Sequence, residues 1–370
     1  VSWLRAMDPR ETKLNILLFA LPITLYFNYV NQNHSMAFFS SLIAIMPLAF
    51  LMGRATEEIA LRTTESLGGL LNATFGNAAE LIIAVLLILE ASRVADPETQ
   101  SFFIQLVQAS LIGSILGNLL LVMGLAFVWG GIHHSEQKYS ETQVSSNGSL
   151  LLLSMIVLVI PTVFHSSVGA EGGDSRLLDL SHIAAAILLL VYGLFLLFQF
   201  RTHVHLFATD GSHHEEPEMT QRDSIILLVV ATVLVSWMAE ILVHSVEYAA
   251  EDFGLPHLFI GVILLPLFGN AAEHFTAVTV AGKDKMDLSF AISMGSSTQI
   301  AVFIAPLMVI IAWALGVPLT FEFGTLETVS AFLAVLIVNS IAADGKSNWL
   351  EGAMLLSSYG VLAAAFLFHP

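Results

Sequence analysis

The hexapeptide Phe-Gly-Asn-Ala-Ala-Glu stands at residues 75–80 and again at residues 268–273. Both copies lie inside strongly apolar runs, 68–90 and 257–281, which are long enough to cross a bilayer. A carboxylate in hydrocarbon is costly and marks a functional site by default. The two glutamates are 193 residues apart. They predict a duplicated half-site, in which each half of the chain contributes one carboxylate to a polar centre near the membrane midplane.

Composition assigns the chain to the integral membrane proteins. Of its 370 residues 56% are hydrophobic and only 12% are charged, and the mean hydropathy is +0.80. The hydrophobic share is above that of soluble domains, and the charged share is below it. A net charge of −17 argues against a nucleic acid partner. The chain has no cysteine, so any metal would be held by oxygen or imidazole ligands.

Apolar runs of spanning length predict an all-α protein with 11 transmembrane helices. Their approximate bounds are 14–30, 36–53, 68–90, 101–129, 148–164, 179–200, 222–247, 257–281, 286–315, 325–342 and 348–368. Alternating the connections between two sides leaves only Arg93 and Arg176, of 13 Lys and Arg residues, on one side. The positive-inside rule then predicts a cytoplasmic N-terminus and a C-terminus on the opposite side.

The motif positions, on the third and eighth helices, predict one N-terminal helix followed by two five-helix repeats, helices 2–6 and 7–11. Since five is odd, the repeats have inverted orientations, as in many secondary transporters. A second echo supports this pairing, because Gly113-Ser114 and Gly295-Ser296 are 182 residues apart. The expected organisation is an N-terminal tail with helix 1 (1–35), a first repeat (36–200), a cytoplasmic loop (201–221) and a second repeat (222–370).

Helix-breaking residues flank both glutamates, Gly76 in one half and Pro266 with Gly269 in the other. A helix broken there exposes carbonyl oxygens that can bind a cation. Further oxygen donors share helix faces with each other or with the glutamates. They are Asn77 and Asn270, three residues before Glu80 and Glu273, together with Ser114, Asn118, Ser296 and Gln299. The position that mirrors Asn118 is Ile300, so Gln299 is the substitute.

This donor set suits a hard divalent cation such as Ca²⁺, which takes six to eight oxygen ligands. Two carboxylates would neutralise its charge, and without the ion their burial would favour protonation. The pattern therefore predicts exchange of one divalent ion for protons by competition. The serines and amides of helices 4 and 9 would either touch the ion or join helices by polar contacts.

Other polar residues receive separate interpretations. Glu57 and Glu240 are expected along an access path, or paired with Arg54 and His244. His274 is a candidate proton relay or a residue with no transport role. In a short cytoplasmic turn, we expect Asp344, Asn348 and Glu351 to be capping and turn residues.

The acidic, histidine-rich loop at 201–221 is either a solvated connector or a regulatory sensor of Ca²⁺ or pH. Its candidate residues are His213, His214, Glu215, Glu216 and Glu218.

Taken together, the residues resemble the calcium/proton antiporters (CAX family) of the cation/calcium exchanger superfamily. The resemblance runs from about residue 45 to the end of the chain. It rests on Gly-Asn-Ala-Ala-Glu in both halves, the second followed by His274, on Lys285-Met286-Asp287, on Gly295-Ser296-Ser297 with Gln299, and on Asp344-Gly345 before residues 347–352.

The resemblance implies that Glu80 and Glu273 are shared ligands of Ca²⁺ and protons. Asn77 and Asn270 would lie beside them as further metal ligands. Sodium-coupled relatives usually have a Gly-Thr/Ser-Ser opening where this chain has Gly-Asn-Ala, which favours protons as the counter-ion. A sodium-coupled calcium exchanger remains the alternative.

Other function classes find less support. The chain lacks the Gly-x-x-x-x-Gly-Lys-Ser/Thr phosphate loop of a pump and the His-Glu-x-x-His motif of a metalloprotease, so we expect no enzyme activity. A cation channel is a further alternative. The expected partners are Ca²⁺, H⁺ and the lipid bilayer, with no cofactor besides the transported ions. A homo-oligomer is compatible with the sequence, as is either a bacterial inner membrane or a vacuolar membrane.

Overall fold

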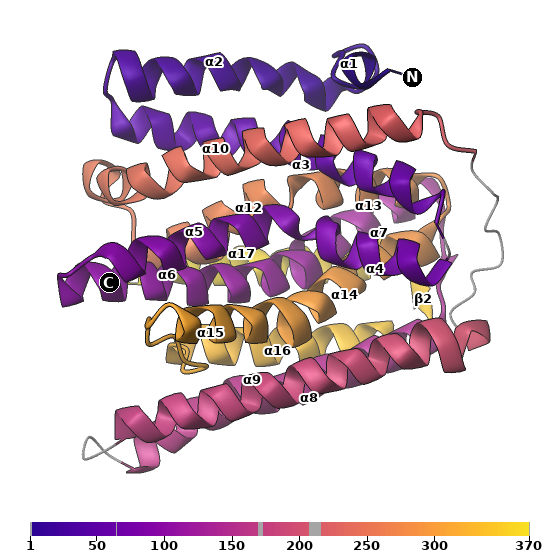
Figure 1. The fold of residues 1–370 in the computed structure, drawn as a ribbon. Coiled ribbons are helices and arrows are strands. Elements are labelled where there is room, and N and C mark those ends of the chain that lie inside the picture. The colour runs from indigo at the N-terminus through magenta and orange to yellow at the C-terminus, as the bar shows by residue number, and fades with distance from the viewer. Residues whose placement is uncertain (1, 64, 169–172, 207–215, 370) are drawn as a thin grey trace.

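The computed structural model describes residues 2–63, 65–168, 173–206 and 216–369. Long helices run roughly side by side (Figure 1). In that view α2 lies at one edge of the bundle, and α8 with α9 lies at the other. The span from α6 to α7 is the most enclosed, whereas α9 and α17 are largely exposed. This arrangement matches a membrane protein, whose outer helices present apolar side chains to lipid.

The first part of the chain forms helices α1 to α9 and strand β1. Their bounds are α1 Trp3–Ala6, η1 Lys13–Phe19, α2 Ala20–Leu25, η2 Tyr26–Val30, α3 His34–Ala60, α4 Glu65–Gly76, α5 Ala78–Arg93, α6 Pro97–Leu116, η3 Gly117–Val122, α7 Met123–His133, β1 Gln137–Lys138, α8 Glu141–Val168, α9 Gly173–Leu197, η4 Phe198–Thr202 and η5 Val204–Leu206.

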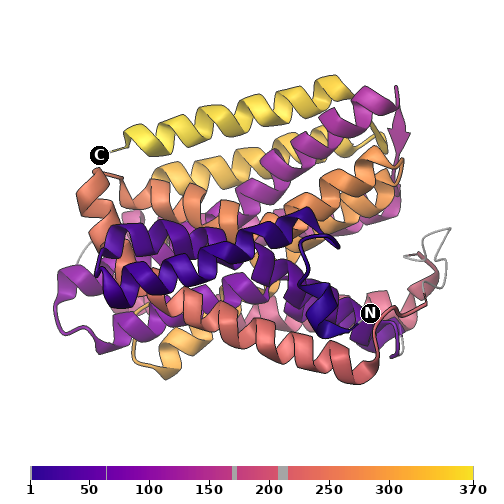
Figure 2. The same ribbon diagram turned by 90° about the horizontal axis from the view of Figure 1, so that it is seen from above.

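The second part forms the remaining helices and strand β2. Their bounds are α10 Gln221–Phe253, α11 His257–Phe259, η6 Ile260–Leu264, α12 Leu265–Gly269, α13 Ala271–Gly282, α14 Met286–Gln299, η7 Ile300–Ile304, α15 Ala305–Ala314, α16 Thr325–Ala342, β2 Lys346–Ser347 and α17 Trp349–Phe368. Figure 2, which looks from above, shows the second part interleaved with the first.

Within the described ranges, nine helices are long and apolar enough to cross a membrane, and ten if the bent pair 257–269 and 271–282 is one span. The sequence predicted eleven. The missing span is the expected helix 68–90, which the structure divides between α4 (12 residues) and α5 (16 residues). Each piece is shorter than the roughly 20 residues that a bilayer requires.

The two repeated motifs break their helices in the same way. Between α4 and α5 lies Asn77, with φ −100° and ψ 22°, and between α12 and α13 lies Asn270, with φ −94° and ψ 5°. The second break bends the chain by 59°. The prediction that these motifs interrupt helices is confirmed. An identical hexapeptide therefore has nearly the same backbone conformation in both halves.

The described residues contain five π-helical segments, none of them predicted: η2, η3, η4, η6 and η7. Two of the five stand at corresponding positions. Segment η3 follows Ser114 on α6, and segment η7 follows Ser296 on α14. Wider turns of this kind occur mostly as short bulges at functional sites. Their matching positions extend the likeness between the halves beyond the motif itself.

The halves also pack closely together. Helices α3 and α10 contact each other along their length, and α6 contacts η6. A Cβ on Gly113 would collide with the backbone of Val262, and one on Gly261 would collide with Ala109. Small residues at these positions let the two backbones approach, as in other membrane helix pairs.

A short antiparallel ribbon joins the halves at one end of the bundle, where β1 pairs with β2. The hydroxyl of Tyr139 donates to the carbonyl of Lys346 at 2.7 Å. Burial raises the pKa of Tyr139, so its hydroxyl stays a neutral donor. Beyond the ribbon, the Asn348 side chain caps α17, and the Glu351 carboxylate accepts a hydrogen bond from the backbone N–H of Asn348. The expected capping roles of these two residues are confirmed.

Candidate ion-binding site

Each repeated glutamate lies in the first turn of the helix that follows its break, Glu80 in α5 and Glu273 in α13. The free N–H groups at a helix N-terminus favour negative charge there. The two carboxylates are also close enough to repel each other. The structure thus brings together two acidic groups that are distant in sequence.

The motif glycines explain how the glutamates fit. A Cβ on Gly76 would lie 3.3 Å from Oε1 of Glu273, and a Cβ on Gly269 would lie 3.9 Å from Cγ of Glu80. Each half therefore places its glycine against the glutamate of the other half. This reciprocal contact is the strongest geometric sign that the two motifs form one site.

Several buried polar atoms around this site have no hydrogen-bond partner among the described residues. They are both oxygens of Glu80, Oε2 of Glu273, Oδ1 of Asn77, Oδ1 and Nδ2 of Asn270, and Nδ2 of Asn118. Burying polar groups without partners costs about 1–3 kcal/mol each. Such a concentration of unpaired carboxylate and amide oxygens is what a hard cation would require for coordination.

The four predicted polar residues on α6, η3 and α14 lie at this site to different degrees. Gln299 accepts a hydrogen bond from Nδ2 of Asn77 at 2.7 Å, which ties the two halves together. Ser296 hydrogen-bonds the Glu273 carboxylate. Ser114 and Glu80 line a common cavity of about 10 Å³, roughly the space of one water. Asn118 is buried in η3, which contacts α13.

The described residues contain no group of three or more His, Asp or Glu side chains that could hold a metal. A divalent ion would thus need amide, hydroxyl or carbonyl oxygens as its remaining ligands. Asn77 and Asn270 supply the nearest such oxygens along the chain, at the two helix breaks. The donor set fits Ca²⁺ and contains no soft ligand.

Glu57 and Glu240, the two residues expected along an access path, lie toward opposite ends of the paired helices α3 and α10. Helices α3 and α10 run antiparallel, with Met52 beside Thr232 and Ser35 beside Asp252. Glu57 is consequently near the end of α3 that contacts residues 218 and 219, whereas Glu240 is toward the other end of α10. Neither lines the small cavity beside Glu80.

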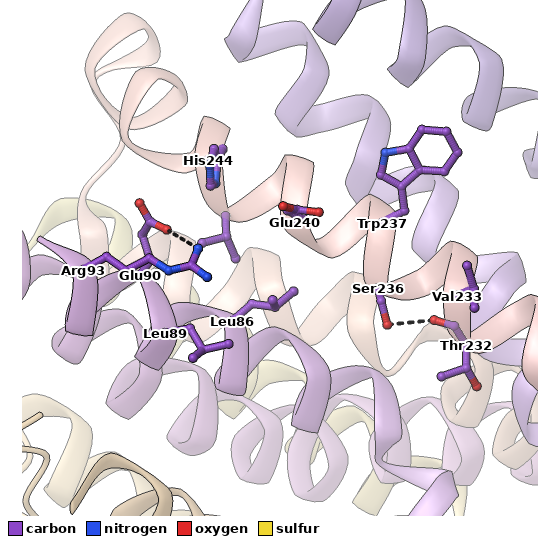
Figure 3. Close-up of a pocket in the computed structure, with 11 residues that line it drawn as sticks. Leu86, Leu89, Glu90, Arg93, Thr232, Val233, Ser236, Trp237, Glu240 and His244 are labelled. Carbon is purple, nitrogen blue, oxygen red and sulfur yellow. Dashed lines mark hydrogen bonds and ion pairs between the residues drawn. The ribbon is translucent and has the colours of Figure 1, made fainter. Parts of the chain in front are cut away.

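The partners expected for these glutamates, Arg54 and His244, lie in different settings. Arg54 forms its ion pair with Glu218 at 3.1 Å. Glu240 and His244 line one cavity between α5 and α10 (Figure 3), with no hydrogen bond or ion pair drawn between them. His274, the residue after the second glutamate, is buried, and its Nε2 has no partner among the described residues.

The loop candidates His213, His214 and Glu215 lie outside the described residues, and Glu216 is exposed. Sequence reasoning overlooked how this loop ends. The carboxylate of Glu58, which is buried, accepts hydrogen bonds from the backbone N–H groups of Glu218 and Met219, both at 3.1 Å. Arg62 pairs with Glu58 at 3.6 Å. The sequence signal for this contact was the presence of two adjacent acids, Glu57 and Glu58, at the end of an apolar helix.

Comparisons with known proteins show the family of the chain. The sodium/calcium exchanger protein family matches residues 34–201 and 223–368. A "Ca(2+)/H(+) antiporter" from Aphanothece halophytica is 44% identical, with 96% of each chain covered. A "Vacuolar calcium ion transporter" from Schizosaccharomyces pombe is 39% identical, with 96% of this chain and 85% of that protein covered.

Among solved structures, that of native YfkE superposes with a TM-score of 0.81 and 36% identity, and covers 96% of this chain and 99% of its own. Both family segments contain one copy of the repeated motif, and together they include every residue of the candidate site. The family resemblance inferred from the sequence is confirmed: this chain is a multi-pass membrane protein that belongs to the sodium/calcium exchanger protein family.

Proposed function

We propose that this protein is a secondary transporter, rather than an enzyme, that exchanges Ca²⁺ for H⁺ across a membrane. The observation that carries the proposal is the pair Glu80 and Glu273, each packed against the glycine of the other half, with three of their four carboxylate oxygens buried and unpaired among the described residues. Relatives that match nearly the whole chain carry the name Ca(2+)/H(+) antiporter.

The exchange follows from competition for the same oxygens. One Ca²⁺ balances the charge of both carboxylates and takes further oxygens from Asn77 and Asn270. When the ion leaves, two mutually repelling carboxylates remain in a site of low polarity, where the protonated form is favoured. Protons and Ca²⁺ therefore exclude each other, which couples their movements. No cofactor besides the transported ions enters this scheme.

Alternating access would arise from the two halves moving against each other. We infer an N-terminal unit (1–35) and two inverted five-helix repeats (36–200 and 222–370), with α4 and α5 together as the eleventh span. The matched breaks at Asn77 and Asn270 and the matched π segments η3 and η7 support this division. Because Lys and Arg gather on one side, we place the N-terminus and the 201–221 loop in the cytoplasm, and the C-terminus opposite.

Substitution of the glutamates tests the proposal. Glu80→Gln and Glu273→Gln keep the side-chain shape but remove charge and titration, so either one should abolish Ca²⁺ uptake driven by a pH gradient in reconstituted vesicles. Glu98→Gln, at an exposed position in the first turn of α6, is the matched control and should transport normally. Near-normal exchange by either glutamate variant would place the ion site elsewhere.

A further inference from the structure

A second polar cavity, separate from the ion site, lies between α5 and α10. Its volume is about 430 Å³. Figure 3 shows Glu90 and Arg93 on α5 facing Glu240 and His244 on α10, with Leu86 and Leu89 beneath them. The cavity thus combines two carboxylates, a guanidinium and an imidazole with an apolar wall.

The cavity opens toward the lipid side of the bundle. On α10, Val229, Val233 and Trp237 are 56%, 60% and 38% exposed, as expected of residues that contact lipid. Glu240 and His244 continue this same helical face and are also exposed. On α5, Glu90 and Arg93 lie about two turns further along the helix than Ile83 and Ala84, which line the cavity beside Glu80. No residue lines both cavities, so the two are separate.

The depth of the cavity matches a membrane interface. From Arg222, near the start of α10, to Glu240 the helix rises by about 27 Å at 1.5 Å per residue, compared with a hydrocarbon thickness of about 30 Å. If Arg222 marks one boundary, Glu240 lies near the other. At the neighbouring level, Nε1 of Trp237 donates to the hydroxyl of Tyr29 at 3.1 Å, and both side chains are exposed. Tryptophan and tyrosine concentrate at such interfaces.

We propose that this cavity binds the headgroup of a phospholipid with a primary amine, phosphatidylethanolamine, from the leaflet opposite the 201–221 loop. The charge pattern fits both ends of that headgroup. An ammonium has three N–H donors for Glu90 and Glu240, and a phosphate takes hydrogen bonds from a guanidinium such as that of Arg93. The apolar surface around Leu86, Val233 and Trp237 then receives an acyl chain.

The ion pair between Glu90 and Arg93 can open, so that each side chain binds the headgroup instead. Oε2 of Glu90 and a terminal nitrogen of Arg93 are 3.9 Å apart, and the Arg93 side chain is 67% exposed. Such a loose surface pair contributes little to stability and can open at small cost. A choline headgroup lacks N–H donors, and a purely anionic headgroup would face two carboxylates. The cavity therefore selects the amine headgroup over both.

A bound lipid would join two helices with different roles. Helix α5 begins beside the Glu80 site, and α10 contacts α3 along its length. Occupancy would restrain α5 against α10 and stabilise the protein without touching the ion ligands. This consequence is independent of which counter-ion is transported.

Lipid binding to the purified full chain tests the inference. Native mass spectrometry would measure retention of phosphatidylethanolamine against phosphatidylcholine and phosphatidylglycerol with the same acyl chains, and thermal unfolding would measure the stabilisation by each lipid. We expect preferential retention of the amine lipid. The double variant Glu90→Gln with Glu240→Gln should weaken it by about tenfold or more. Glu247→Gln, exposed on the same helix outside the cavity, should leave it unchanged.

Two outcomes would overturn the assignment. Equal retention of the three lipids, or unchanged selectivity in the double variant, would show that the charged groups do not read the headgroup. A change of oligomeric state in the double variant, with lipid retention unchanged, would assign this face to a second copy of the chain. Because the readouts are binding and unfolding, a failed test would leave the proposed ion exchange unaffected.

Discussion

Gly76→Ala should impair Ca²⁺ transport more than its mirror substitution, Gly269→Ala. The new methyl group at residue 76 would lie 3.3 Å from Oε1 of Glu273, whereas the one at residue 269 would lie 3.9 Å from Cγ of Glu80. The second distance is an ordinary van der Waals contact. The 3.3 Å distance requires the Glu273 carboxylate to move by a few tenths of an ångström. Comparing the two variants therefore distinguishes the effect of crowding a glutamate from the effect of replacing a glycine.

The expected size of the effect follows from that movement. Turning a side chain by about 30° from its preferred rotamer costs about 0.5–1.5 kcal/mol. Apparent Ca²⁺ affinity should then fall by roughly 2- to 13-fold in Gly76→Ala. Folding should not suffer, because Gly76 is the last residue of α4 and alanine favours a helix by up to about 1 kcal/mol over glycine.

The assay is the initial rate of Ca²⁺ uptake against Ca²⁺ concentration, in reconstituted vesicles with a fixed pH gradient. Thermal unfolding of each variant is measured in parallel. We expect a raised half-saturating concentration in Gly76→Ala and near-normal transport in Gly269→Ala. Equal losses in both variants, or normal affinity in Gly76→Ala, would refute the reciprocal packing of glycine against glutamate.

Three further predictions concern the cap of α17 and the 201–221 loop. Asn348→Ala removes the acceptor for two N–H groups of α17 and should destabilise the protein by about 0.5–2 kcal/mol, seen as a lower unfolding temperature without loss of ion selectivity. If the loop is a sensor, replacing Glu215, Glu216 and Glu218 with glutamine should shift the activating Ca²⁺ concentration by roughly five- to a hundredfold. Unchanged activation curves would leave the loop as a solvated connector. Independently, Glu58→Ala should speed amide exchange at residues 218 and 219, because it removes the acceptor of their N–H groups.

Sequence reasoning found the two helix breaks because the residues that cause them are local. Gly76, Asn77 and their counterparts break helices by intrinsic preference, and an apolar context makes each neighbouring glutamate conspicuous. The hydrogen bond between Asn77 and Gln299 could not be predicted from the sequence. That contact joins residues 222 positions apart, and the repeat itself offered Ile300 rather than Gln299 as the mirror of Asn118.

Other features depend on packing that leaves little trace in the pattern. The π segments η3 and η7 have apolar sequences that would suit an ordinary α-helix. Glu58 was not singled out beside Glu57, yet the fold buries its carboxylate as the acceptor for the backbone N–H groups of residues 218 and 219. Glu90 and Glu240 fall within expected helices and Arg93 in an expected connection, but their common cavity requires the contact between α5 and α10.

The most direct test of Ca²⁺/H⁺ exchange is the Ca²⁺ gradient at which net flux reverses in vesicles with a set pH difference and no membrane potential. With two protons per Ca²⁺, each pH unit supplies about 2.7 kcal/mol, and the reversal point should move by roughly a hundredfold in Ca²⁺ ratio. The same shift should occur with and without sodium. A reversal point that follows the sodium gradient and ignores pH, or a flux that runs down the Ca²⁺ gradient at every pH difference, would contradict proton-coupled exchange.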